Sequence, residues 1–532
     1  MTKKGSMRKA EYKPLLFTTT VRSPERMKGL LKVLSNFNRK KLTNALATEI
    51  VGELIRYGLY RPMKQSPEIK AKWKSTKSGE FSEVLLTDNE VITMLRNNPQ
   101  DHKEAGFDKG WPSRFATFFD FAKELGFVYY CPEENIQFSE VGLKLTNSIE
   151  IKIEDNLIMV SDIHPEFEQQ VFLHALVKYQ RNNPFVRVLN DNAPLILLLK
   201  IIKKLNDDKD FNNVGISKLE LPLVIFWKNN SADELYEQIK EIRKKYRYNP
   251  SSEVIVGACI NHIGAFKKFK PKSITTEYPD EFIRKMRLTG LFSLRGGGRF
   301  IDINKNEQEK VDYILGKYSR YTPYKTEKEY FDYMAKTDKN LLSPFVVLSD
   351  VEYGEKNLEK WITIYSWQKI KEELNILSKK KLSKDGLLKY LSSPVRLEFL
   401  IAIAIKSKFP NIKVIPNYPC DDEGLPTSTA GGVGDKGDIE CYEGTNGILI
   451  EVTMTEGRTQ TVAEVWPIVR HLEKFSENTK NSMCYFVAPS IFKDSLRQIR
   501  DARLHDKLFI LPKTIDEFLK HLDEAEMLYN AS

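Results

Sequence analysis

Residues Asp438 to Thr453 read Asp-Ile-Glu-Cys-Tyr-Glu-Gly-Thr-Asn-Gly-Ile-Leu-Ile-Glu-Val-Thr. The pattern predicts two strands, Ile439 to Glu443 and Ile448 to Met454, joined by a turn containing Asn446-Gly447, a dipeptide that readily supplies positive φ. With the turn centred between Thr445 and Asn446, Thr453 lies opposite Asp438 and Glu451 is its diagonal neighbour, so all three share one face. Two neighbouring carboxylates predict a cation between them, and Mg²⁺ accepts such oxygen ligands. The alternative is an acidic surface hairpin.

The segments around this hairpin predict an α/β domain. Ser393-Pro394 is an N-cap and first-position proline, and the helix that follows runs to about Lys408. Glu398 lies at the edge of the apolar stripe of this helix. The predicted order is this helix, a strand at Ile412 to Ile415, the two hairpin strands, a helix at Val462 to Phe475 and a strand at Met483 to Ala488.

That order and the acidic pair resemble the catalytic core of the PD-(D/E)xK nuclease superfamily. The superfamily motif usually ends in Glu-x-Lys, whereas this chain has Glu451-Val452-Thr453 and lacks the lysine. A wider pattern resembles the active site of the AlwI family of type IIS restriction endonucleases and the related nicking endonucleases, and the segment from Thr18 to Arg26 is also similar to that family. The residues of the wider pattern are Glu398, Asp438, Glu451, Glu464 and His471.

The resemblance implies a role for each of these residues. Asp438, Glu451 and the backbone carbonyl of Val452 would be ligands of Mg²⁺. Glu464 would complete the metal site or orient water, His471 would contact phosphate or assist proton transfer in place of the lysine, and Glu398 would help to position the metal. Glu464 and His471 are seven residues apart and share a face if one helix holds both, unless the helix starts near Pro467 and leaves Glu464 in the entry turn.

Composition and charge indicate a globular protein with an anionic partner. The 532 residues are 41% hydrophobic, enough for three or four packed domains. The net charge is +10, and residues 1–40 hold eleven Lys or Arg against two Glu. This arm is either a phosphate-contacting surface, with Arg22, Arg26 and Lys28 as candidates, or a solubilising tail.

Cysteine usage and hydropathy together predict the cellular compartment of the protein. The five cysteines are scattered without a C-x-x-C pair, which argues against a zinc site or a disulfide framework. No stretch approaches the roughly 18 apolar residues of a membrane span, and the start lacks the apolar run of a signal peptide. We therefore expect a cytoplasmic protein without a membrane partner.

Two helix–hairpin–helix patterns precede the acidic hairpin. The first spans Phe115 to about Ser148, and the second runs from Phe282 through the turn Gly296-Gly-Gly298 to the helix after Asn306. Both resemble the wing end of a winged helix-turn-helix, although the same pattern occurs in units that do not touch DNA. Arg295 and Arg299 bracket the second turn and are candidate DNA contacts, as is Lys74 beside Trp73, which is otherwise the anchor of a surface loop.

The fold prediction is an α+β multidomain protein. It comprises a helical, winged-helix-like amino-terminal DNA-recognition region, a helical linker and a carboxy-terminal α/β PD-(D/E)xK nuclease domain with a mixed central sheet. The predicted boundaries are 1–149 and 150–315 for two recognition subdomains, 316–388 for the linker and 389–532 for the cleavage domain.

The resemblance implies a type IIS restriction endonuclease that binds double-stranded DNA at a short asymmetric site, similar to GGATC or GAGTC, and hydrolyses a phosphodiester a few bases outside it with Mg²⁺. One such motif cuts one strand, so nicking, action with a second copy and action with a small catalytic subunit all remain open. A cognate DNA methyltransferase is an expected partner. The alternatives are a DNA-binding protein with a decayed nuclease domain, which the missing lysine favours, and a repair or recombination nuclease that recognises structure.

Overall fold

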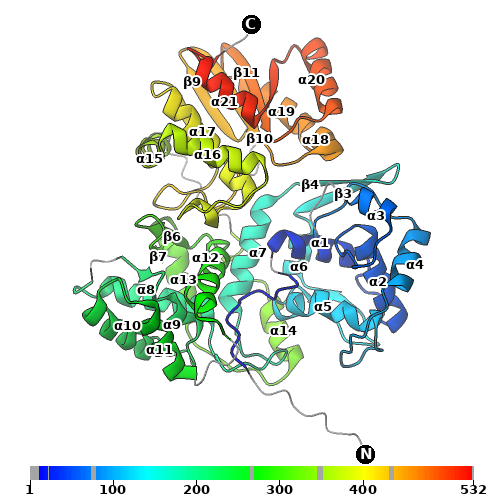
Figure 1. Cartoon of the computed structure of the whole chain (residues 1–532), viewed down its shortest axis with the longest axis vertical. Coiled ribbons are helices and arrows are strands. Elements are labelled where there is room, and N and C mark those ends of the chain that lie inside the picture. Colours follow the sequence, from blue (N-terminus) through cyan, green and yellow to red (C-terminus); the bar gives the residue numbers. More distant parts are fainter. Residues whose placement is uncertain are drawn as a thin grey trace, which may run out of the picture.

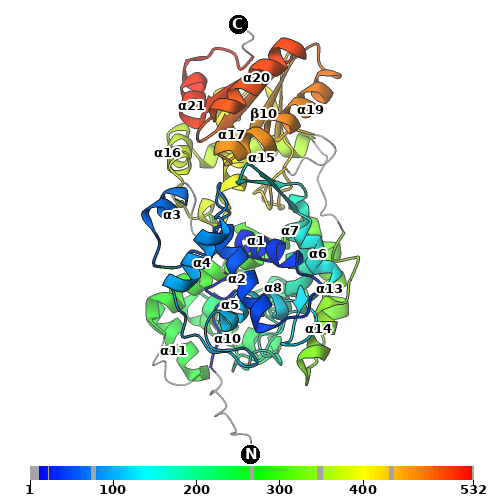
Figure 2. The same cartoon turned by 90° about the vertical axis from the view of Figure 1, so that its right-hand side faces the viewer.

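The protein is arranged in three parts around helix α7 (Pro165–Lys178) in a computed structural model that describes residues 11–21, 23–73, 79–211, 214–263, 269–343, 351–430 and 436–529. A first lobe runs from α1 to β4, a second lobe from α8 to α13, and a sheet region from α15 to α21. The sheet region lies above the two lobes in two perpendicular views (Figures 1 and 2). The architecture is mixed α and β, as predicted.

The first lobe is built from short capped helices and two small hairpins. Ser23 accepts a hydrogen bond from the Arg26 amide at the start of α1, and Thr87 forms a capping box with Glu90 at the start of α4. Its elements are α1 (Pro24–Ser35), α2 (Asn44–Arg56), α3 (Pro67–Lys72), α4 (Asp88–Asn97), α5 (Trp111–Glu124), β1 (Val128–Tyr129), β2 (Gln137–Phe138), α6 (Glu140–Thr146), β3 (Ile149–Glu154) and β4 (Leu157–Asp162).

The second lobe packs around the apolar helix α8 (Pro194–Asp207), whose Leu and Ile side chains are buried. A three-stranded sheet in the order β5-β7-β6 closes this lobe on the side of the sheet region. The remaining elements are β5 (Ile216–Ser217), α9 (Leu221–Ile225), α10 (Ala232–Tyr246), α11 (Ser252–Ile263), a π-helix (Ser273–Glu277), α12 (Tyr278–Arg287), β6 (Phe292–Arg295), β7 (Phe300–Ile303) and α13 (Gln308–Tyr318).

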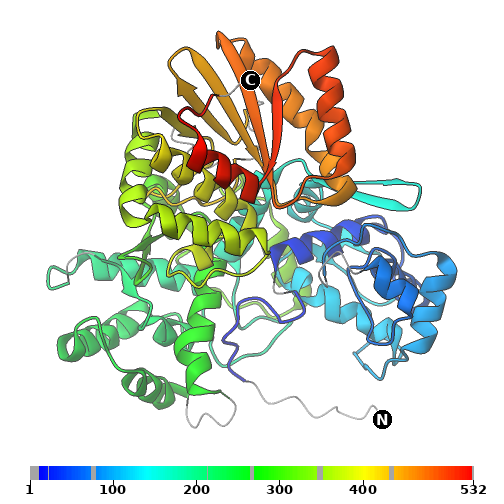
Figure 3. The ribbon, with the colours of Figure 1, turned by 45° about the horizontal axis from the view of Figure 1, so that its top comes forward.

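The sheet region contains a five-stranded mixed sheet in the order β12-β11-β10-β9-β8, with helices on both sides (Figure 3). β10 pairs with β11 in parallel and with β9 antiparallel. Side chains alternate between two cores, because Leu449 packs with α19 and α20 whereas Ile448 and Ile450 face the other side. The elements are β8 (Lys413–Pro416), β9 (Ile439–Glu443), β10 (Asn446–Val452), α18 (Gly457–Ala463), α19 (Val465–Ser476), β11 (Asn481–Ala488), α20 (Lys493–His505), β12 (Ile510–Thr514) and α21 (Ile515–Glu524).

Helix α17 (Ser393–Lys408) is the predicted helix before the sheet, but it is capped one residue earlier than expected, at Ser392. It is buried from Val395 to Lys406 on all sides, rather than along a single stripe. The reason is that α15 (Val351–Ile364) and α16 (Trp367–Ser378) cover the face that the sheet leaves open. Glu398 is consequently an interior residue.

The acidic hairpin forms with a different register from the predicted one. The turn is Gly444–Thr445, with Gly444 at φ +64°, and the Asn446-Gly447 dipeptide already belongs to β10. Continuing the observed pairing by one residue places Asp438 opposite Glu451, not opposite Thr453. The register prediction was wrong by two residues, and a shift of two keeps every side chain on its predicted face.

The glycine at position 447 is explained by packing. A Cβ there would lie 2.7 Å from the ring of Phe475 and 2.6 Å from the Thr479 methyl group. Helix α19 and the residues after it therefore approach the backbone of β10 closely, and this close approach requires the absence of a side chain.

The predicted helix Val462 to Phe475 is two helices, α18 and α19, that meet at Glu464. Glu464 closes α18 and precedes α19, whose first turn contains Pro467. The second of the two arrangements considered from the sequence is therefore the observed one. Glu464 lies in the turn that enters the helix carrying His471.

Both helix–hairpin–helix patterns form the predicted secondary structure, as α5, β1, β2 and α6 in the first lobe and as α12, β6, β7 and α13 in the second. The segment 316–388, predicted as a linker, divides between two parts of the molecule. Helix α14 (Glu327–Ala335) packs on α5, α6 and α7, whereas α15 and α16 pack on α17. No helix among the described residues is long and apolar enough to cross a membrane.

Candidate active site

Asp438 and Glu451 meet at the carboxyl end of β10. Asp438 lies one residue before β9, and its Oδ2 accepts a hydrogen bond of 2.8 Å from the Val452 amide, which fixes the carboxylate against the backbone of the neighbouring strand. Glu451 is only 6% exposed. Gly437 allows the two to approach, since a Cβ at that position would lie 2.5 Å from Glu451 Oε1.

His471 reaches this pair from α19. Its Nδ1 is 2.8 Å from Glu451 Oε1, on the face of the sheet that α19 covers. The bond orients the Glu451 carboxylate. Sequence reasoning had placed His471 in the site, and the structure brings it there.

Glu464 is held by a short chain of hydrogen bonds that starts at Thr453, the residue at the position of the missing lysine. Thr453 Oγ1 accepts from the Thr455 amide at 2.9 Å and lies 2.9 Å from Glu464 Oε1, to which it donates. Because a carboxylate can only accept, the direction of this bond is fixed. Thr453 therefore fills the motif position with a hydroxyl that orients Glu464.

Glu398 approaches from α17, on the opposite side of the sheet from His471. It is 4% exposed, and its Oε2 accepts a hydrogen bond of 2.9 Å from the Ala430 amide. Ala430 belongs to the long loop between β8 and β9, which ends at Asp438. The loop thus binds one acidic residue of the site and carries another.

The four carboxyl groups form one electrostatic cluster. Burial and the charge of Asp438 raise the pKa of Glu398 well above its usual value, and burial together with Glu451 does the same for Asp438. Burial followed by the charge of Glu464 raises the pKa of Glu451. Burial also raises the pKa of Glu464, although its hydrogen bonds from Thr455 and Thr453 oppose that shift. Negative charge is concentrated here without a Lys or Arg bonded to it among the described residues.

This donor set fits a hard divalent cation. Among the described residues, no group of three His, Cys, Asp or Glu side chains lies close enough together to hold a metal ion by itself. Mg²⁺ needs few protein ligands, because it is commonly held by one or two carboxylates together with waters and substrate phosphate. Asp438, which is half-buried, and Glu451, which is buried beside it, supply that number.

The first lobe contributes a residue that sequence reasoning missed. Strand β4 packs on α18, and the charge of Asp162 at its end contributes to the raised pKa of Glu464. Asp162 also accepts a hydrogen bond of 2.7 Å from Lys28, which pairs with Glu168 as well. Only the tertiary fold brings residue 162 within range of residue 464, so no local signal in the sequence announces it.

The predicted DNA-binding residues of the first lobe differ in their exposure and in their hydrogen-bond partners. Lys28 is 7% exposed and committed to its two carboxylates, so the structure does not present it at the surface. Arg26 is half-buried, and its Nε is buried without a hydrogen-bond partner. Arg22 and Lys74 lie outside the described residues. Trp73 is buried, with Arg61 donating to its carbonyl, as expected of an anchored loop.

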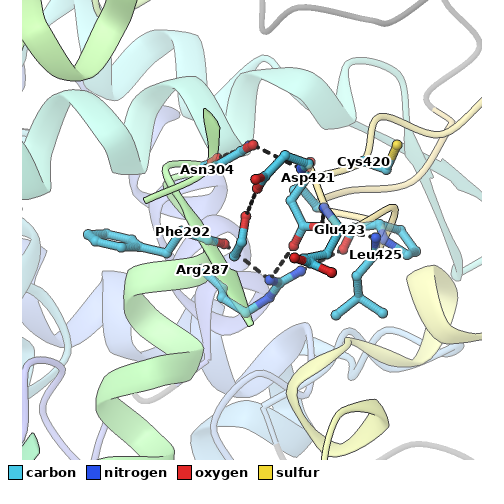
Figure 4. Close-up of polar contacts among 12 residues, drawn as sticks. Arg287, Phe292, Asn304, Cys420, Asp421, Glu423 and Leu425 are labelled. Atoms are coloured by element: carbon cyan, nitrogen blue, oxygen red, sulfur yellow. Dashed lines mark hydrogen bonds and ion pairs between the residues drawn. The ribbon is translucent and has the colours of Figure 1, made fainter. Parts of the chain in front are cut away.

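The two arginines of the second hairpin differ from each other. Arg299 is exposed, whereas Arg295 donates to Asp302 at 2.7 Å, to Asp422 at 2.9 Å and to Glu423. The last two belong to the loop between β8 and β9, so Arg295 binds the sheet region (Figure 4 shows this loop). Arg295, a candidate DNA contact in the sequence analysis, is instead paired with acidic residues that tertiary packing brings to it.

Comparison with known proteins places these features in context. The family model described as AlwI restriction endonuclease matches residues 123–366 and 348–521. No curated protein matches the chain. Among solved structures, the small subunit R.BspD6I2 of the heterodimeric restriction endonuclease R.BspD6I is 23% identical over 29% of this chain and 78% of its own, with a TM-score of 0.25. Restriction endonuclease FokI is 11% identical over 94% of both chains, with a TM-score of 0.24.

Proposed function

This chain belongs to the AlwI restriction endonuclease family, and from that premise we propose that it is a type IIS enzyme, which binds a short asymmetric site in double-stranded DNA and hydrolyses a phosphodiester a few bases outside it. As a type II restriction endonuclease it is a hydrolase of phosphodiester bonds. The observation that carries the proposal is the pair of Asp438, half-buried just before β9, and Glu451, buried on the neighbouring strand β10, bordered by Glu398, Glu464 and His471.

Mg²⁺ is the proposed cofactor, held by Asp438, Glu451 and the carbonyl oxygen of Val452. When bound, it neutralises charge on the scissile phosphate and lowers the pKa of a coordinated water. The hydrogen bond that the Val452 amide donates to Asp438 holds that carboxylate in place before the ion arrives. Two carboxylates held close together and away from bulk water are energetically costly unless a positive charge balances them. This cost is the physical reason to expect a cation here.

The missing lysine is replaced by two residues in this proposal. His471 orients Glu451 through Nδ1, and its imidazole is proposed to contact phosphate or to assist proton transfer. Thr453 orients Glu464, which directs the attacking water. Glu398 steadies the loop end at Ala430 and so acts on the position of the metal through the protein.

Division of labour within the chain follows the three parts of the fold. We assign recognition of DNA to the two helix–hairpin–helix units, read as winged-helix subdomains with boundaries near 1–149 and 150–315, and cleavage to the sheet region. The proposed linker 316–388 joins them. Arg22, Arg26, Lys74 and Arg299 remain the proposed contacts to DNA phosphates.

One catalytic cluster hydrolyses one strand. With one such cluster per chain, we propose that double-strand cleavage requires a second copy of the chain or a small catalytic subunit, and that a chain acting alone would nick. A cognate DNA methyltransferase that modifies the same site is the expected companion. A DNA-binding protein with a decayed nuclease is the alternative that the test below excludes or establishes.

The test is incubation of the purified protein with supercoiled plasmid and Mg²⁺, followed by mapping of the ends on each strand. Discrete ends at a fixed distance from one short sequence are the expected result. Open circles without linear product would assign nicking. Specific binding without hydrolysis under any divalent cation would contradict the proposal and support the decayed nuclease.

A further inference from the structure

The loop between β8 and β9 joins the sheet region to the second lobe through consecutive acidic residues. Asp421 bonds to Arg287 of α12, while Asp422 and Glu423 bond to Arg295 of β6 (Figure 4 shows the contacts of this loop). Asn304, just after β7, accepts a hydrogen bond of 3.1 Å from the Asp422 amide. The hairpin β6–β7 therefore presents its polar groups to the protein's own sheet region.

The pair of Arg287 and Asp421 lies in the interior. The exposed fractions of the two side chains are 5% and 0%, and the guanidinium also donates to the carbonyl oxygens of Phe292 and Pro426. A buried charge pair with its remaining donors satisfied is costly to separate, because each partner would be left as an unpaired buried ion. This feature indicates a permanent joint rather than a transient contact.

A second contact holds the same two parts together. Asp280 of α12 accepts hydrogen bonds of 3.1 Å from Lys389 and 2.7 Å from the Tyr390 hydroxyl, both in the segment that enters α17. At the tip of the hairpin, Gly298 lies so close to Gly386 that a Cβ would be 2.6 Å from its carbonyl oxygen. Two separate attachments restrict rotation of one part against the other.

The acidic loop is also mechanically tied to the catalytic cluster. Its first residue, Asn417, donates from its backbone amide to the Asp438 carbonyl at 2.9 Å, and its side chain donates to the Gly437 carbonyl at 2.7 Å. Further along, the Ala430 amide holds Glu398. The loop that binds the β6–β7 hairpin therefore also holds the backbone of Asp438 and the carboxylate of Glu398.

We propose that the face of the β6–β7 hairpin that carries Arg295 is a docking platform for the sheet region and does not contact DNA, and that this rigid docking sets the distance between the recognition site and the cut. The inference rests on the proposed cleavage outside the recognition site. A fixed joint places the catalytic cluster at one phosphate, whereas a loosened joint would let it reach several.

The test compares cut positions in wild type and in the double variant Asp422→Asn/Glu423→Gln, on DNA with one recognition site, with ends mapped at nucleotide resolution. The matched control is Asp501→Asn/Asp506→Asn, which neutralises two exposed carboxylates at the far side of the sheet region. Affinity for the site is measured in parallel with Ca²⁺ in place of Mg²⁺. A second variant, Asp280→Asn, loosens the other attachment, so the outcome does not depend on one set of side chains.

The expected result is that both loosened variants spread their ends over neighbouring phosphates, while the control cuts as wild type does. Site affinity should stay within about twofold, as for changes distant from the bound DNA. Unchanged cut positions in both loosened variants would overturn the proposal, as would faster cleavage at the original phosphate, which would make the joint a restraint. A loss of affinity for the recognition site would indicate that this face of the hairpin contacts DNA, which would also overturn the proposal. Cuts inside the site by wild type would instead contradict the proposed function.

Discussion

Two acidic clusters, one within the loop between β8 and β9 and the other at the end of that loop, differ in how their charge is balanced. Asp421, Asp422 and Glu423 are bonded to Arg287, Arg295 and Lys360. The cluster around Asp438 and Glu451 has His471 in hydrogen-bond contact, and among the described residues no Lys or Arg is bonded to its carboxylates. The first cluster is balanced by the protein's own basic residues and holds the protein together. For the second, we propose that a divalent cation supplies the balancing charge.

The largest expected effect is on catalysis. Replacing Asp438 by Asn removes a proposed metal ligand but keeps the hydrogen bond from the Val452 amide, so the fold should persist. We expect plasmid cleavage to fall by about 10³-fold or more, since metal-assisted charge stabilisation contributes several kcal/mol to the barrier. Cleavage rates with excess Mg²⁺ measure this. A variant that cuts at the wild-type rate would remove Asp438 from the mechanism.

For the cluster of Asp421, Asp422 and Glu423, we expect an effect on stability. Arg287→Ala leaves Asp421 buried and unpaired, which should lower the free energy of unfolding by about 3–5 kcal/mol. Chemical denaturation monitored by circular dichroism measures the loss. Arg299→Ala is the matched control, because that arginine is exposed and its removal should change stability by no more than about 0.5 kcal/mol. Equal effects of the two would mean that the buried pair is not the joint described here.

A smaller effect is expected at Thr453. Thr453→Val keeps the shape of the side chain but removes the hydroxyl that orients Glu464, and we expect kcat to fall about 10- to 100-fold, as for other groups that orient active-site ligands. Thr453→Ser retains the hydroxyl and should retain most of the activity. Single-turnover cleavage and site affinity are measured together. If Ser and Val variants behave alike, the hydroxyl has no positioning role.

The smallest expected effect is on the pH dependence of stability without divalent cations. Burial raises the pKa of Glu398, Asp438 and Glu451 above the unfolded values of about 4. Their contribution to stability is therefore full below the unfolded pKa and is lost as pH rises through the folded pKa. The Tm should fall in EDTA as pH rises above the unfolded pKa of about 4, and Asp438→Asn should flatten the slope. A Tm that rises over this range would contradict the sign.

The pair of Asp438 and Glu451 could be predicted from a local strand pattern, whereas Glu398, Glu464 and His471 were implied by the resemblance to the AlwI family. The alternation of Ile448 to Glu451 fixes which face each side chain takes, and this survived an error of two residues in register. The error arose because Asn446-Gly447 has strong turn propensity, while packing of α19 on Gly447 decided the outcome.

The contacts between distant segments could not be predicted. Lys28 and Arg295 look like DNA contacts in the sequence because an isolated basic residue carries no sign of its partner. Asp162, Asp422 and Glu423 reach them only through the tertiary fold. The same limit hid the role of Asp162 beside Glu464, which depends on β4 lying against α18.

The central claim, that the unbalanced cluster is a cation site and the balanced one is not, is tested most directly by calorimetric titration of Mg²⁺ into the DNA-free protein. Wild type, Asp438→Asn and Asp422→Asn are compared at one pH. We predict that Asp438→Asn loses the binding heat and that Asp422→Asn retains it. Binding by Asp438→Asn equal to that of wild type would place the cation elsewhere and contradict the account.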